Sequence, residues 1–284
     1  MTFPPVRMLG SATRLLESQH TGRTYQISVS LPLGYHRAPA EPWPFDATPE
    51  RWPVVYVLDG NWYFGLVTDT LRRMAWCGGT TDAIVVGIGY PEPEDPIEAF
   101  RLSFTRRNHD LTPVPDPAID QQMEARHGLP CPSGDAANFH RFIQHELIPL
   151  IERDYRADPA RRLLAGHSYG GLFATYALLT APTLFATFII GSPSLGYGQR
   201  FAFQYEDAYA QHNQQLPATV YWFVGEDEED LHYRTLSTTL QFAAILENRH
   251  YPGLTFKKHI FMEQNHCEVA VPGLQWGLKH ALKR

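Results

Sequence analysis

The residues Gly166-His167-Ser168-Tyr169-Gly170 form a G-x-S-x-G pattern between two apolar stretches. The run Arg162–Ala165 before the pattern predicts a strand, and Gly171–Leu179 after it predicts a buried helix. A serine on a sharp turn between a strand and a helix exposes its hydroxyl, because small flanking residues let the backbone pass closely. A phosphate-binding loop would need further glycines and a lysine, which this segment lacks. The pattern therefore predicts that Ser168 is a catalytic nucleophile.

A serine hydroxyl becomes an effective nucleophile when a base accepts its proton. In hydrolases with this motif, an acid and then a histidine follow the serine along the chain. Among the histidines after Ser168, His266 lies in a polar loop directly after Phe256–Phe261, which we predict as the last strand. His259 lies within that strand. We therefore expect His266 to be the base.

A run of acidic residues follows the strand predicted at Thr219–Val224, and any of them could be the third member of a triad. An acid in that role fixes the tautomer of the histidine and stabilises its protonated form. The remaining acids would be solvated or would cap the next helix. Spacing alone does not choose among them, and a serine–histidine dyad stays open. The run consists of Glu226, Asp227, Glu228, Glu229 and Asp230.

Attack by a serine on a carbonyl group also needs two backbone N–H donors that stabilise the oxyanion. The Tyr169 N–H follows the serine and is helped by the dipole of the helix that begins there. We expect the second donor after the buried strand Val54–Leu58, in Asp59-Gly60-Asn61. Gly60 permits a tight turn, and the Asn61 N–H could then point at the substrate carbonyl.

These residues must be positioned by strands that alternate with helices. Such alternation predicts an α/β fold with a mostly parallel sheet and helices on both of its faces. Polar and apolar residues alternate in Arg23–Leu31, which predicts a half-buried strand. Further strands are predicted at Ala83–Ile88 and Phe185–Ile190, and helices at Ala137–Arg153, Tyr233–Asn248 and Leu274–Leu282.

Two proline-rich segments interrupt the pattern. Residues 38–53 are predicted as a surface loop. Residues 91–135 show little periodicity, and we interpret them as an insertion that covers the active site, with a surface excursion against the sheet edge as the alternative. The length of 284 residues suggests about two domains. The single alternating series instead favours one domain over residues 1–284, with the excess length in these two segments.

Composition limits the partners. The chain has 24 basic and 30 acidic residues, a net charge of −6 and no basic run, which argues against nucleic-acid binding. No apolar run is long enough for a membrane span, and no signal peptide is evident, so we expect a cytoplasmic protein. The sparse cysteines, Cys77, Cys131 and Cys267, are typical of a reducing compartment. The absence of HExxH and CxxC patterns predicts neither metal nor cofactor. The oligomeric state stays open.

Together these features resemble the putative-esterase family of α/β-hydrolases, which includes feruloyl and acetyl esterases, S-formylglutathione hydrolases, mycolyltransferases and siderophore trilactone esterases. The Arg-x-x-Asp-Leu-Thr-Pro element at 107–113 and the GHSYGGLF segment most resemble the siderophore-esterase branch. The resemblance is carried by residues 55–61, 107–113, Phe142–Ile151, 166–179, Ser192-Pro193-Ser194 and Asn265-His266.

The resemblance implies an α/β-hydrolase fold and ester hydrolysis through an acyl-enzyme. It also implies that the acid stands third after the strand-end glycine, which selects Glu228. One departure concerns the residues after Ser194. Trilactone esterases commonly have paired tryptophans there, whereas this chain continues Leu195-Gly196-Tyr197-Gly198 and lacks that platform for catechol rings.

Several residues are candidates for contact with the substrate. Arg106 and Arg107 could bind anionic or phenolic groups through charge-assisted hydrogen bonds. Alternatively, Arg107 pairs with Asp110 or a nearby acid and fixes the insertion. Aromatic residues near the predicted site suggest an aryl or bulky acyl group, with core packing as the alternative. The substrate-contact candidates are Gly60, Trp62, Tyr63, Phe64, Arg107, Tyr169 and Tyr197.

The sequence as a whole predicts a serine carboxylic-ester hydrolase that acts on a small to medium, aromatic or siderophore-like ester. Two other functions fit the same motifs. One is acyl transfer to an alcohol on the same scaffold. The other is a binding module without catalysis, because a fold does not by itself imply a function.

Overall fold

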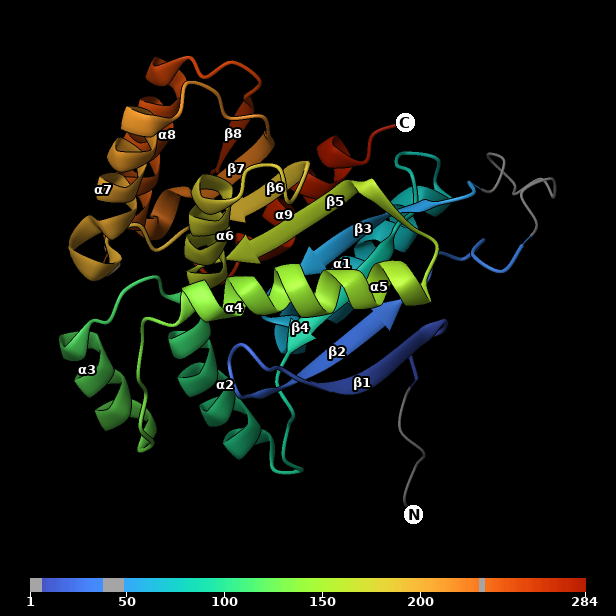
Figure 1. Ribbon diagram of the computed structural model, residues 1–284, viewed down its shortest axis with the longest axis horizontal. Coiled ribbons are helices and arrows are strands. Elements are labelled where there is room, and N and C mark those ends of the chain that lie inside the picture. Colours follow the sequence, from blue (N-terminus) through green and yellow to red (C-terminus); the bar gives the residue numbers. More distant parts are fainter. Residues whose placement is uncertain (1–6, 38–48, 230–232) are drawn as a thin grey trace.

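A twisted sheet of eight strands forms the centre of the computed structural model, which describes residues 7–37, 49–229 and 233–284 (Figure 1). The strand order is β1-β2-β4-β3-β5-β6-β7-β8. Pairing is antiparallel between β1, β2 and β4 and parallel across the rest. The strands are β1 Ser11–Glu17, β2 Thr24–Ser30, β3 Trp52–Val57, β4 Ile84–Gly89, β5 Ala157–His167, β6 Thr187–Gly191, β7 Thr219–Gly225 and β8 Thr255–Phe261.

Helices cover both faces of this sheet, because its central strands are apolar on both sides. Every residue of β3 and of β4 is buried. Helices α1 and α9 pack on one face over the Val55 and Val57 side of β3, and α4 to α8 cover the Val54 and Tyr56 side. The helices are α1 Gly60–Trp76, α2 Pro96–Leu111, α3 Pro117–His127, α4 Ala136–Phe142, α5 Ile148–Asp154, α6 Tyr169–Thr180, α7 Tyr197–His212, α8 Thr235–Arg249 and α9 Ala270–Ala281, with a π-helical turn at Ile143–Leu147 and a 3₁₀ turn at Glu226–Glu228.

This architecture confirms the predicted α/β fold with a mostly parallel sheet. The proline-rich segment at 91–135, which we interpreted as an insertion with little periodic structure, contains the helices α2 and α3, which lie beyond the carboxyl ends of β3 and β5 (Figure 1). Asp95 and Asp116 cap these helices with their side chains, and Pro96 and Pro117 stand directly after the caps. Proline at the first helical position loses no hydrogen bond, since that N–H has no partner within the helix. The prolines therefore begin helices here.

The other proline-rich segment falls mostly outside the described residues, since 38–48 are not among them. Its last part was predicted wrongly, because Trp52 and Pro53 are the first residues of β3 rather than loop.

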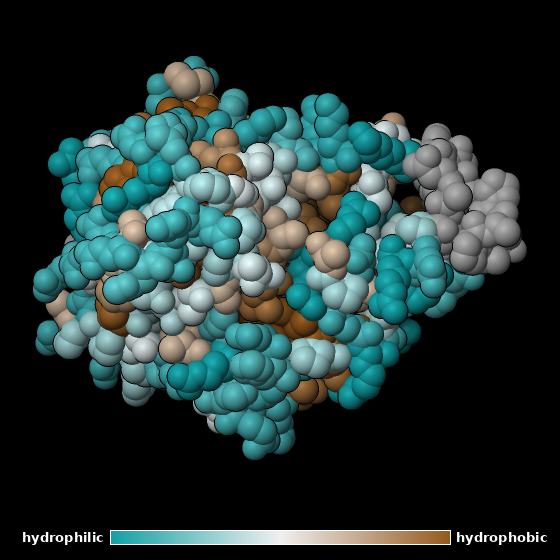
Figure 2. All heavy atoms as spheres, turned by 45° about the horizontal axis from the view of Figure 1, so that its top comes forward, coloured by the Kyte–Doolittle hydropathy of each residue, from teal (hydrophilic) through white to brown (hydrophobic). Residues whose placement is uncertain are grey.

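Figure 2 shows one face of the molecule covered mainly by hydrophilic side chains, with hydrophobic ones in narrow strips between them. Among the helices of the described residues, none combines the length and the apolar character that a membrane span requires.

Candidate active site

Ser168 lies on the sharp turn between β5 and α6. Its φ of 62° and ψ of −120° are unusual for a residue with a side chain, and such a conformation costs about 1–3 kcal/mol. The turn is fixed by a hydrogen bond from the Ser168 N–H to the Gly191 carbonyl, 2.9 Å long. A side chain at Gly166 would collide with the Gly170 carbonyl oxygen, so small residues are needed on both sides of the serine. This geometry leaves Ser168 half-buried at the edge of a cavity.

His266 follows β8, and its Nδ1 lies 2.6 Å from Oε2 of Glu228. The other oxygen, Oε1, accepts hydrogen bonds from Ser192 Oγ at 2.7 Å and from the Gly225 N–H at 2.6 Å. Glu228 is fully buried, whereas the His266 side chain is 25% exposed. A carboxylate with hydrogen bonds on both oxygens has a fixed direction, so it can hold one imidazole tautomer and stabilise the imidazolium.

The neighbouring acids face elsewhere. Glu226 accepts a hydrogen bond from the Glu263 N–H, and Glu229 binds Arg234 and Ser237. Asp227 is exposed, and Asp230 lies outside the described residues. Of the described acids in this run, Glu228 is the one that the 3₁₀ turn directs back toward His266.

Both predicted oxyanion donors stand at helix N-termini. Tyr169 is the first residue of α6, and Asn61 is the second residue of α1. The Asn61 side chain forms two hydrogen bonds with the Tyr90 backbone, of 2.7 and 2.9 Å, which fix its backbone beside β4. Gly60 is required for packing, because a side chain there would lie 2.7 Å from the Ile88 nitrogen.

Two cavities meet at Ser168 and His266, with volumes of about 370 and 250 Å³. Ser168, His266, Phe104 and Arg107 line both. The larger cavity is also lined by Trp62, Tyr63, Phe100, His167 and Cys267. The smaller is also lined by Met123, Tyr169, Ser194, Tyr233 and Thr235. The two cavities give a substrate room on both sides of the serine.

Arg107 lies between the cavities and pairs with Asp59 through two parallel hydrogen bonds, of 2.8 and 2.9 Å. The acid that pairs with Arg107 is thus Asp59 rather than Asp110. Burial by itself lowers the pKa of Arg107, but the Asp59 charge and its hydrogen bonds outweigh that effect and raise it. The guanidinium also faces the rings of Trp62 and Tyr169, with centroids 5.0 and 5.2 Å away.

Not every aromatic candidate reaches the cavities. Tyr197 is 1% exposed, its hydroxyl donates to the Val114 carbonyl, and it lines neither cavity. Phe64 packs against Gly87 of β4. Sequence reasoning missed Phe100 and Phe104, because their segment was not recognised as a helix. Aspartate followed by proline at 95–96 was the signal that could have revealed it.

His167 was also missed as a neighbour of the base. Its ring lies 4.6 Å from that of His266, and its Nδ1 lies 3.1 Å from the Tyr63 hydroxyl. Burial, followed by the nearby charges of His266 and Arg107, lowers the pKa of His167 well below its usual value. It therefore stays neutral beside the base.

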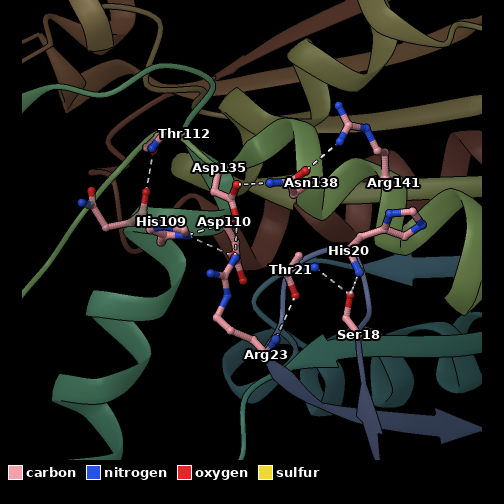
Figure 3. A network of polar contacts seen from close by, with 12 residues as sticks. Ser18, His20, Thr21, Arg23, His109, Asp110, Thr112, Asp135, Asn138 and Arg141 are labelled. Carbon is pink, nitrogen blue, oxygen red and sulfur yellow. Dashed lines mark hydrogen bonds and ion pairs between the residues drawn. The ribbon is translucent and has the colours of Figure 1, made fainter.

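A second polar cluster lies at the end of α2. Potential ligand atoms of His109, Asp110 and Asp135 lie within 4.8 Å of one another. Figure 3 shows Arg23 reaching toward both carboxylates, and its Nη2 binds Asp110 and Asp135. The guanidinium already supplies the positive charge that a metal ion would bring. This cluster therefore joins the start of β2 to α2 and α4.

Comparisons with known proteins agree with this geometry. The family model for putative esterases matches residues 18–265. The chain is 35% identical over 201 residues to the ferri-bacillibactin esterase BesA of Bacillus subtilis, and 35% identical over 206 residues to the siderophore enterobactin esterase of Emericella nidulans. Each match covers 70% of this chain but 63% of the relative, so the chain spans less than two thirds of these curated relatives.

Solved structures match over almost the whole chain. The crystal structure of the BES protein from Bacillus cereus has a TM-score of 0.79 and 27% identity, and the match covers 100% of this chain and 99% of that one. The siderophore hydrolase EstA from Aspergillus nidulans has a TM-score of 0.78 and 25% identity, with 99% and 97% covered.

Proposed function

The chain belongs to the putative-esterase family, and on this premise we propose that it is a serine carboxylic-ester hydrolase acting through an acyl-enzyme. In this mechanism Ser168 attacks the ester carbonyl carbon. Because Nδ1 of His266 is engaged by Glu228, Nε2 is the nitrogen left to accept the serine proton. His266 then protonates the leaving alcohol, and water attacks the acyl-enzyme by the same route.

The N–H groups of Asn61 and Tyr169 are proposed to stabilise the oxyanion of each tetrahedral intermediate. Both are backbone donors at helix N-termini, so they are oriented before the substrate arrives. The observation that supports this function most is the 2.6 Å contact between Glu228 and His266. His266 lines the same cavity as Ser168, which stands on a strained turn.

The experiment that tests this function is the substitution Ser168→Ala. Hydrolysis of a short p-nitrophenyl ester should fall to background while the circular dichroism spectrum stays unchanged, because the alanine removes the attacking atom alone. Ser237→Ala is the matched control, since that serine binds Glu229 away from the cavities. Turnover that persists in Ser168→Ala would refute the assignment. Failure of a fluorophosphonate to label Ser168 in the unmodified protein would favour a binding module instead.

We propose an aromatic, siderophore-like ester as the substrate class. The two relatives described above are siderophore esterases by name, and the larger cavity carries a cluster of rings. Phe104 lies with its centroid 4.7 Å from Phe100 and 5.1 Å from Trp62. Such rings favour a planar aromatic group by offset or edge-to-face packing. A matched series of benzoyl and hexanoyl esters with one alcohol tests the acyl preference. An equal kcat/KM for both would contradict it.

A further inference from the structure

Asp59 stands directly before α1, where aspartate usually caps a helix. In a normal cap, the carboxylate accepts a hydrogen bond from the N–H of the second or third helical residue. Asp59 forms no such bond, and Arg107 takes both of its oxygens. The second helical residue is Asn61, whose N–H is the oxyanion donor of the proposed mechanism.

We propose that Arg107 is a positioning residue that keeps the Asp59 carboxylate away from the N-terminus of α1, so that the Asn61 N–H stays available to the oxyanion. This inference rests on the proposed esterase function. It assigns Arg107 a role through Asp59, whereas the sequence suggested direct contact with a substrate anion.

The backbone of Asp59 supports this role. Its φ of 51° and ψ of 47° lie in the left-handed region, which costs a residue with a side chain free energy. Capping requires the extended conformation. Without Arg107, Asp59 would relieve its strain and gain a cap by changing to that conformation. Both effects would bring the Asp59 carboxylate onto the Asn61 N–H and block the oxyanion site. The ion pair with Arg107 prevents this change.

The charge of Asp59 is a second reason for a paired arginine. The residue is 6% exposed, and a side chain at Gly170 would lie 3.2 Å from its Oδ2. Gly170 follows Tyr169, the other proposed donor. A buried, unpaired carboxylate beside the two turns that carry the donors would repel the developing oxyanion. Arg107 cancels that charge with well-aligned hydrogen bonds.

Arg107 is itself held in place by the other residues of its motif. Asn108 donates to the Cys131 and Pro132 carbonyls, at 2.8 and 3.1 Å. Asp110, one turn further along α2, accepts a hydrogen bond from Tyr25. It also binds Arg23 (Figure 3). The Arg-x-x-Asp spacing thus places Arg107 beside Asp59, while Asp110 fixes the end of α2 to the residues around β2.

The test compares Arg107→Gln with the double variant Asp59→Gly/Arg107→Gln. Arg107→Gln should lower kcat for a p-nitrophenyl ester about 10²- to 10³-fold, the usual loss for one oxyanion donor, with KM changed less than about threefold. In the double variant, glycine adopts the left-handed conformation without strain and has no carboxylate to cap or repel. The kcat of the double variant should be at least about tenfold higher than that of Arg107→Gln, which is less than the full effect of one oxyanion donor.

Arg153→Gln is the matched control, because this arginine pairs with Asp154 on the surface and lines neither cavity. It should keep kcat unchanged. A rise in KM alone in Arg107→Gln would make Arg107 a substrate contact and overturn the proposal. A double variant no more active than Arg107→Gln would also overturn it.

Folding is followed by circular dichroism in each variant. If Arg107→Gln does not fold, a folded and active double variant supports the proposal, and an unfolded double variant refutes it. The outcome is separate from that of the proposed function. Loss of activity in Ser168→Ala together with full activity in Arg107→Gln would remove only the present inference.

Discussion

Two buried carboxylates in this protein have similar surroundings and different consequences. Glu228 accepts hydrogen bonds from Ser192, Gly225 and His266. Asp110 accepts them from Tyr25, Tyr90 and Arg23. Both have no exposed side-chain surface.

The two carboxylates differ in what their hydrogen-bond partners contact next. His266 turns its other edge to the cavities that contain Ser168, whereas the partners of Asp110 connect β2, β4 and α2. A buried carboxylate with all its hydrogen bonds made therefore indicates a candidate active site only when one of its partners reaches a cavity. Without that cavity it is a structural tie between elements.

The largest effect that separates the two regions is expected for Glu228→Gln. The amide cannot hold the same imidazole tautomer or stabilise its charge, so kcat should fall about 10²- to 10⁴-fold with little change in KM. Steady-state kinetics on a p-nitrophenyl ester measures this. Glu226→Gln and Glu229→Gln are matched controls and should stay within about threefold of the unmodified enzyme. A residual kcat above a tenth in Glu228→Gln would indicate a serine–histidine dyad.

Asp110→Asn should affect stability first. It removes the charge of a buried carboxylate, whereas its partner Arg23 is 27% exposed and keeps Asp135, so we expect a loss of about 1–3 kcal/mol. The midpoint of urea unfolding should fall accordingly, while Asp154→Asn, in an exposed pair with Arg153, leaves it unchanged. The comparison fails if Asp110→Asn lowers kcat as steeply as Glu228→Gln and leaves the midpoint where it was.

A smaller effect is expected from His140, a buried titratable group without an acidic partner among the described residues. Burial, and next the charge of His145, lower its pKa to about 4. The unfolded chain, with a pKa near 6.5, binds the proton first as the pH falls. The contribution of His140 to the free energy of unfolding is therefore fully present above about pH 6.5. It decreases toward pH 4, by about 3 kcal/mol in total.

Urea titrations at pH 7.5, 5.5 and 4.5 measure this dependence. His140→Asn should flatten it, and the exposed His212→Asn should leave it as in the unmodified protein. If the slope is the same with and without His140, the buried imidazole is not its source.

The sequence predicted the central strands well, because an apolar run buried on both faces depends little on distant contacts. Strand β1 was not predicted, since most of its residues are exposed and, among the described strands, it pairs with β2 alone. Helix α1 was missed because it begins directly at Gly60 and Asn61, whose types usually indicate a turn.

The candidate site divides in the same way. Ser168 and His266 were predicted from local motifs and chain order, and Glu228 from family resemblance, and the structure brings the three residues together. The Asp59 partner of Arg107 was not identifiable, because the two residues are 48 positions apart and meet only in the folded chain, where α2 packs against α6. For Tyr197, sequence proximity to Ser194 suggested a cavity position, but the backbone break at 198–200 accompanies a side chain turned into the core.

The backbone of Ser168 also bears on how such a protein changes in descent. At φ 62° and ψ −120° glycine would fit without strain. A lineage released from selection for catalysis would therefore gain stability by exchanging its nucleophile for glycine. A lineage that retains the serine pays continuously in folding free energy, and the surrounding core must supply the difference. Under the proposed mechanism, the serine is retained at this position because its hydroxyl is the attacking group.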